Sequence, residues 1–265
     1  MLHASGWFFL GAGALYAVAM VLSVWVLLSA RREMVPWLPR LAIPGLVLHF
    51  GGLVARTLAE GGVPDLTLKE ILFLVAFAAI SVYLLAHFKF RIEFLGIIIL
   101  PVVVALMAVT TLIPDEPARV TETWRMSLRA VHVVPAVLGV AFLFLTFGTS
   151  IVYLIQEKGL KNHRPGRFFG ALPSLERCDR LSYMSLGWGF AFLTLVVFTG
   201  ALTNRYTHGD FSWVARERWA LLAWVLFAIV IYDRVFAGRW RGRLSAYLSI
   251  IGFIAIILRM IGIGA

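Results

Sequence analysis

Two histidines, His49 and His132, lie inside long apolar segments of the chain. A polar ring surrounded by lipid is costly unless it finds a hydrogen-bond partner or a ligand. An imidazole nitrogen can bind a metal, including the iron of haem. The alternative is that each histidine makes a hydrogen bond to a neighbouring helix. The residues alone leave both interpretations open for both histidines.

The two histidines are expected at different depths in the membrane. His49 lies well inside the apolar segment 41–60, whereas His132 lies near the start of the segment 128–156. If both helices are straight, their depths differ by roughly 10 Å at a rise of 1.5 Å per residue. We therefore expect two sites, or one site between tilted helices, rather than one iron held by both side chains.

Membrane-spanning helices would position these side chains. Of the 265 residues, 61% are hydrophobic and 14% are charged, whereas a soluble domain has about 25% charged residues. A helix needs about 20 apolar residues to cross a bilayer. Eight segments meet this condition, and they are 6–29, 41–60, 70–88, 92–112, 128–156, 182–203, 217–236 and 244–263. We predict an all-α integral membrane protein, with a single eight-helix domain over residues 1–265.

Basic residues are concentrated in alternate connections between these segments, including the longest connection, 157–181. Lys and Arg collect on the cytoplasmic side of a membrane, which places both termini on the outer, periplasmic side. We expect a multi-pass protein of the bacterial inner membrane. Its net charge of +10 then reflects orientation and contact with anionic membrane lipid, not binding of nucleic acid. The connection 157–181 could instead dock a cytoplasmic partner.

The sequence lacks the residues that several kinds of chemistry require. The one cysteine, Cys178, excludes a disulfide within the chain and a zinc cluster built on cysteines. Phosphate-binding loops, nucleophile elbows and zinc-protease motifs are absent from the sequence. No apolar segment carries the row of carboxylates expected of a proton relay. We therefore predict no catalytic residues and do not expect enzymatic turnover. The first apolar segment, 6–29, is too long for a signal peptide and is interpreted as a retained span.

The outer connection 204–219 combines aromatic and basic residues. Its aromatic residues, with one that follows, are Phe211, Trp213, Trp219 and Trp224. They could form an interfacial aromatic belt, or a flat apolar platform for a planar ligand such as a porphyrin. The arginines that could pair with porphyrin propionates are Arg205, Arg216 and Arg218. His208, in the same connection, is a further candidate for a weak axial ligand.

The chain resembles a known family from about His49 to its end. The resemblance is carried by two histidine segments, HFGGLVARTLAEGGVPDLTLKEILFL and WRMSLRAVHVVPAVLGVAFLFLTFGTSIVYLIQEKGLK. Three later stretches follow in the same order: LPSLERCDRLSYMSLGWGFAFLTLVVFTGAL, FSWVARERWALLAW and GRWRGRLSAYLSIIGF. Together they are similar to the cytochrome c assembly protein family, the haem-handling group that includes CcsA, CcmC and HemX-like proteins.

The resemblance implies that haem is bound in the membrane and at its outer face. Members such as CcsA and CcmC present haem to a chaperone or to an apocytochrome with a CxxCH motif. Carried over to this sequence, His49 and His132 are expected axial ligands of haem b. Phe211, Trp213 and Trp219 are expected to hold the porphyrin. Haem and other cytochrome c assembly proteins are then the implied partners.

The chain departs from the family's outer motif, WGxxWxWDPKExW. Phe211 replaces its second tryptophan, Val214-Ala215 replaces the Asp-Pro pair, and Arg216 replaces the lysine, while Glu217 and Trp219 match. The later membrane histidine aligns near Tyr232, and the sequence ends at GIGA without a final histidine segment.

These departures resemble the HemX-like branch, which is associated with tetrapyrrole biosynthesis. Two main functions follow. The first is a haem-binding protein of cytochrome c biogenesis. The second is a membrane regulator or scaffold, without tight haem binding, that acts on a tetrapyrrole-synthesis enzyme through the connection 157–181. A haem or small-molecule exporter is a third possibility.

Overall fold

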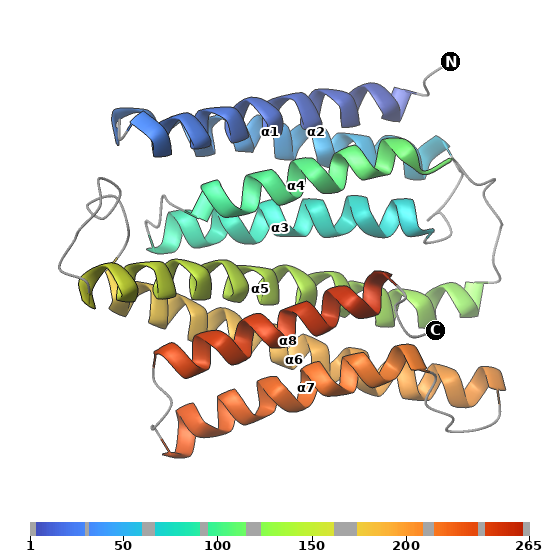
Figure 1. Cartoon of the computed structure of the whole chain (residues 1–265). Coiled ribbons are helices and arrows are strands. Elements are labelled where there is room, and N and C mark those ends of the chain that lie inside the picture. Colours follow the sequence, from blue (N-terminus) through green and yellow to red (C-terminus); the bar gives the residue numbers. More distant parts are fainter. Residues whose placement is uncertain are drawn as a thin grey trace. The chain divides into compact units, whose positions relative to one another are not determined.

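The computed structural model describes residues 4–29, 32–59, 67–90, 95–114, 123–161, 174–208, 215–237 and 242–261 (Figure 1). In these ranges every regular element is a helix. The helices are α1 (Ala4–Ser29), α2 (Trp37–Ala59), α3 (Leu68–Phe90), α4 (Leu95–Leu112), α5 (Thr123–Lys161), α6 (Leu175–His208), α7 (Ala215–Tyr232) and α8 (Arg243–Ile261). A 3-10 turn, Arg32–Met34, precedes α2, and a π-helical segment, Asp233–Ala237, follows α7.

Seven of the described helices, α1 to α7, are long and apolar enough to cross a bilayer. The apolar part of α8 within the described residues, Arg243–Leu258, is shorter. The prediction of an all-α membrane protein is therefore confirmed.

Two helices are much longer than a bilayer requires. α5 has 39 residues, or about 58 Å at 1.5 Å per residue, against a hydrocarbon core of about 30 Å. The helix contains the predicted segment 128–156 and extends beyond both of its ends. α6 was expected only over 182–203, and that boundary was wrong. It begins at Leu175 because Ser174 caps it, accepting a hydrogen bond from the backbone N–H of Arg177 at 3.4 Å.

The helices fall into two compact units, which are described separately. The first contains α1 to α4, and the second contains α5 from Ser127 onward together with α6, α7 and α8. In the first unit α1 packs on α2 and α4, and α3 packs on α4 and α2 (Figure 1).

Glycines bring α1 close to α2. A Cβ atom added at Gly45 would lie 2.6 Å from a ring carbon of Tyr16, and one at Gly52 would lie 2.8 Å from a ring carbon of Phe9. Small residues let helix backbones approach closely in membranes. The rings of α1 therefore lie directly on the backbone of α2, on either side of His49.

A buried ion pair joins α2 and α3 near one end of the first unit. Arg56 lies 2.6 Å from Glu70, and their side chains are 17% and 6% exposed. Thr67 caps the same end of α3, where the backbone N–H of Ile71 donates to its carbonyl at 3.0 Å. The pairing of Arg56 with Glu70 follows from the low dielectric, in which a buried charge needs an opposite charge.

In the second unit, α5 and α6 meet through small and hydroxyl-bearing residues. Thr146 and Ser185 share a hydrogen bond of 2.9 Å between their hydroxyl oxygens. A Cβ atom at Gly189 would lie 2.7 Å from Leu143 of α5. α7 packs against both α6 and α8.

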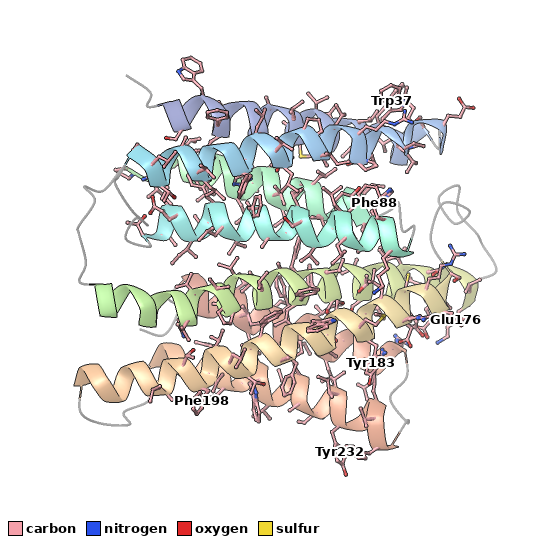
Figure 2. All side chains as sticks on the ribbon, turned by 180° about the vertical axis from the view of Figure 1, so that it is seen from behind. Trp37, Phe88, Glu176, Tyr183, Phe198 and Tyr232 are labelled. Carbon is pink, nitrogen blue, oxygen red and sulfur yellow. The ribbon has the colours of Figure 1, made fainter. Side chains whose placement is uncertain are left out.

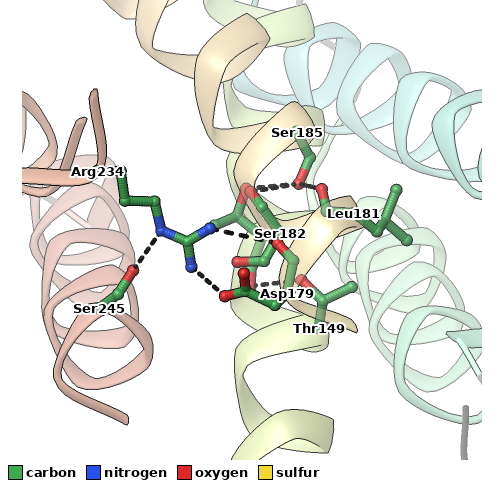
Figure 3. Close-up of polar contacts among 8 residues, drawn as sticks. Thr149, Asp179, Leu181, Ser182, Ser185, Arg234 and Ser245 are labelled. Atoms are coloured by element: carbon green, nitrogen blue, oxygen red, sulfur yellow. Dashed lines mark hydrogen bonds and ion pairs between the residues drawn. The ribbon is translucent and has the colours of Figure 1, made fainter. Parts of the chain in front are cut away.

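Arg234, in the π-helical segment, ties three elements together (Figure 3). Its Nε donates to Ser245 of α8 at 3.1 Å, and its terminal nitrogens bind the carboxylate and the backbone carbonyl of Asp179 of α6. Charge-assisted hydrogen bonds of this kind are stronger than hydrogen bonds between neutral groups.

Gly242 starts α8 in the left-handed region, with φ of +90°. Its carbonyl accepts from Ala246 at 3.0 Å, and a Cβ atom here would overlap the hydroxyl of Tyr153. Glycine alone adopts this conformation at little cost.

Candidate functional site

His49 lies near the middle of α2 and is completely buried in the first unit. Aromatic rings from two other helices surround it. The ring centroids of Phe9, Tyr16, Phe73 and Phe77 lie 5.7, 6.1, 6.1 and 5.6 Å from that of the imidazole. The first two belong to α1 and the others to α3, so His49 sits in an aromatic cage.

Neither ring nitrogen of His49 has a hydrogen-bond partner among the described residues. The backbone of Phe73 approaches the imidazole ring, but without the geometry of a hydrogen bond. The hydroxyl of neighbouring Tyr16 also lacks a partner within the described part of the chain. A buried polar group without a partner costs about 1–3 kcal/mol. A buried imidazole whose nitrogens can coordinate iron, surrounded by aromatic rings, fits an axial ligand of haem.

His132 has a different environment. It lies on α5, next to the start of the apolar stretch Val131–Lys161, and is partly exposed. Its Nδ1 lies 2.9 Å from the hydroxyl of Thr199 on α6. A Cβ atom at Gly200 would lie 3.4 Å from its Cε1, so the ring rests beside the backbone of α6. For His132, then, the hydrogen bond to a neighbouring helix is present.

His49 belongs to the first unit and His132 to the second. Because the two units are described separately, the expectation of two sites stays a prediction. Within the described residues, no group of three or more His, Cys, Asp or Glu side chains could hold a metal ion. A histidine that acts as a single protein ligand binds a group that brings its own donor atoms, as a porphyrin does.

Most of the predicted aromatic platform lies outside the described residues. This applies to Phe211 and Trp213, and to the side chains of Arg205, His208, Arg216 and Arg218. α6 continues to His208 and α7 begins at Ala215, so helices extend into the segment expected as a connection.

Two tryptophans of the platform region are described. Trp219 is half-buried in the second turn of α7. Trp224 stacks on Phe190, with centroids 5.6 Å apart, and donates to Thr194 at 3.0 Å. These contacts place Trp224 at the α6–α7 interface, where it joins the two helices.

Tyr232, the residue aligned with a later family histidine, points outward (Figure 2). Its side chain is 64% exposed and its ring is 5.2 Å from that of Phe236. It stands at the last residue of α7, opposite the end of α7 that follows α6. At this position the side chain of Tyr232 does not line a buried site within its unit.

Several site residues were missed by the sequence analysis. They are the cage residues around His49 and the Thr199 partner of His132. The glycines at 45 and 52 were the available signal for the cage, because small residues spaced around a buried histidine indicate a close helix contact.

These features define a class, a multi-pass helical membrane protein with a histidine on a membrane helix in each of two helical units. The chain belongs to the cytochrome C assembly protein family, whose model matches residues 66–265. This confirms the resemblance. The matched residues include His132 but not His49.

Similar relatives are named cytochrome c biogenesis protein CcsA. The one from Microcystis aeruginosa is 28% identical, over 86% of each chain. The one from Mesostigma viride is 28% identical, over 76% of this chain and 73% of the relative. The one from Chlamydomonas reinhardtii is 29% identical, over 85% of this chain and 67% of the relative.

Proposed function

We propose that this protein binds haem inside the membrane and near its outer face, and that it acts in cytochrome c biogenesis. The observation that carries the proposal is the aromatic cage, which holds a fully buried imidazole whose two nitrogens have no hydrogen-bond partner among the described residues. The names of the CcsA relatives support the same process.

In this proposal haem is the cargo. His49 supplies a ligand within the membrane, and His132 supplies one near the outer end of α5. Phe211, Trp213 and Trp219 hold the porphyrin by its faces. Haem b is the expected form, because the chain has one cysteine and so lacks the CxxCH motif to which haem is covalently attached.

The proposal includes a topology. The apolar segment 244–263 makes α8 an eighth span. Both termini then lie on the outer side, and the connection 157–181 faces the cytoplasm of a bacterial cell.

Haem content of the detergent-purified protein tests the ligand assignment. A pyridine haemochrome assay gives both the amount and the type of haem. We expect His49→Ala and His132→Ala each to lower haem content several-fold and to change the Soret band. His87→Ala is the matched control, because His87 also lies on a membrane helix, and it should retain the wild-type spectrum. Full haem content and an unchanged spectrum in both test variants would contradict the proposal.

One set of residues favours a second function. Val214-Ala215, in place of an Asp-Pro pair, and the exposed Tyr232, in place of a membrane histidine, support a HemX-like regulator of tetrapyrrole synthesis. Such a protein would be colourless and would not take up added haemin. It would instead retain a cytoplasmic enzyme in pull-down experiments, and reversing the charge of Lys158 and Lys161 would abolish that recovery.

A further inference from the structure

The contact between His132 and Thr199 indicates which imidazole nitrogen carries the proton. The Nδ1 atom of His132 and the hydroxyl oxygen of Thr199 are 2.9 Å apart. Either atom could in principle donate, because a neutral imidazole has one protonated nitrogen and a hydroxyl both donates and accepts.

Two backbone contacts of Thr199 indicate the direction of the bond. Its hydroxyl oxygen lies 2.7 Å from the carbonyl oxygen of Leu195 and 3.3 Å from that of Val196. A carbonyl oxygen can only accept, and the hydroxyl has a single proton. That proton is used on the shorter contact, to Leu195, a common arrangement for threonine in membrane helices. Thr199 then offers a lone pair to His132, and Nδ1 is the donor.

We propose that Thr199 is a positioning residue that holds His132 as the Nδ1–H tautomer and so makes Nε2 the atom that binds a metal. In metal sites, the second ring nitrogen of a ligating histidine almost always donates to such a partner, which fixes tautomer and ring orientation. The metal-binding part rests on the proposed function, whereas the tautomer does not.

The surroundings of the contact support this role. Thr199 lies inside the apolar stretch Leu175–Leu202, where water competes little for the hydrogen bond. Gly200 adds no side chain beside the ring, whose Cε1 would be 3.4 Å from a Cβ atom there. The ring can therefore lie against α6 at the distance that the bond requires.

The test compares three substitutions on α6. Thr199→Val keeps the shape but removes the acceptor, and Thr199→Ser keeps the hydroxyl. Thr194→Val is the matched control. The Thr194 hydroxyl also donates to a backbone carbonyl, that of Phe190 at 2.8 Å, and accepts from Trp224, but it does not contact His132.

The first readout is the tautomer itself, measured by ¹⁵N NMR on haem-free, histidine-labelled protein at alkaline pH. The His132 signals are assigned by their loss in His132→Ala. We expect the wild type, Thr199→Ser and Thr194→Val to have a protonated Nδ1 and an unprotonated Nε2. We expect Thr199→Val to have a larger share of the tautomer with a protonated Nε2 than the wild type has. The same His132 tautomer in Thr199→Val as in the wild type, or a protonated Nε2 in the wild type, would overturn the proposal. Thr199→Ala serves if Thr199→Val does not fold.

The second readout is haemin affinity. Loss of such an outer partner typically lowers metal affinity about 10–100-fold, and we expect this for Thr199→Val but not for Thr199→Ser or Thr194→Val. An unchanged affinity in Thr199→Val would overturn the positioning role. A wild-type protein that binds no haemin, yet has the expected tautomer, would overturn the proposed function and the metal-binding part while leaving the tautomer established.

Discussion

The two histidines differ in how their nitrogens are satisfied. His132 has a hydroxyl partner on α6, whereas His49 is surrounded by aromatic rings and has none among the described residues. An unsatisfied buried group is retained at a cost to stability, which is common where function requires it.

This difference predicts opposite effects on the stability of the haem-free protein. His49→Phe should raise the free energy of unfolding by about 1–3 kcal/mol, because it removes two unsatisfied polar atoms from an aromatic cage. His132→Phe should lower it by about 1 kcal/mol, because it removes a hydrogen bond. Thermal unfolding in detergent measures both. Destabilisation by His49→Phe would mean that His49 has a partner in solution.

Gly45 is a second position where one side chain decides the packing. Gly45→Val should destabilise the first unit by about 1–3 kcal/mol, because its Cβ atom would lie 2.6 Å from the Tyr16 ring. Gly187→Ala is the control, since nothing lies within 4 Å of a Cβ atom there. Equal melting temperatures for Gly45→Val and the wild type would show that α1 can shift.

At the level of helices, the apolar runs were sufficient to predict that each described helix exists, and to place His49 and His132 on them. The ends of α6 were predicted poorly. Its first two turns contain Glu176, Arg177 and Asp179, which suggested a connection, but the Ser174 cap and the Asp179–Arg234 pair allow these charges within a helix. Partners such as Thr199 and Glu70 were not predicted, because contacts between helices depend on their relative rotation and not on local sequence.

The Arg56–Glu70 pair should stabilise the contact between α2 and α3. Glu70→Gln removes the carboxylate that lies 2.6 Å from Arg56 and should cost about 3 kcal/mol, the lower end for a buried pair. Adding Arg56→Met should recover part of this loss in a double-mutant cycle. Glu157→Gln breaks the exposed pair with Lys161 and should cost about 0.5 kcal/mol or less. Equal losses at the two sites would contradict the buried role of Glu70.

For the whole molecule, the number of spans determines where the C-terminus lies. Eight spans place both termini on the same side of the membrane, which is the outer side in the proposed orientation, and seven place them on opposite sides. The buried Cys178 allows a Cys178→Ser background with a new cysteine at Ala265 or at Lys161. A membrane-impermeant maleimide added to intact cells should label Ala265→Cys but not Lys161→Cys. Labelling of Lys161→Cys alone would reverse the proposed orientation, and labelling of both or neither would contradict eight spans.

Gly242 and Tyr153 carry a consequence for how this sequence can change over generations. A side chain at Gly242 meets two obstacles, a left-handed backbone and the Tyr153 hydroxyl. Shrinking Tyr153 removes only the second, because left-handed φ disfavours most residues whatever the space. Tyr153 can therefore drift while glycine stays, whereas a lineage that loses the glycine must rebuild the start of α8. Among natural variants, we expect position 153 to vary well before position 242.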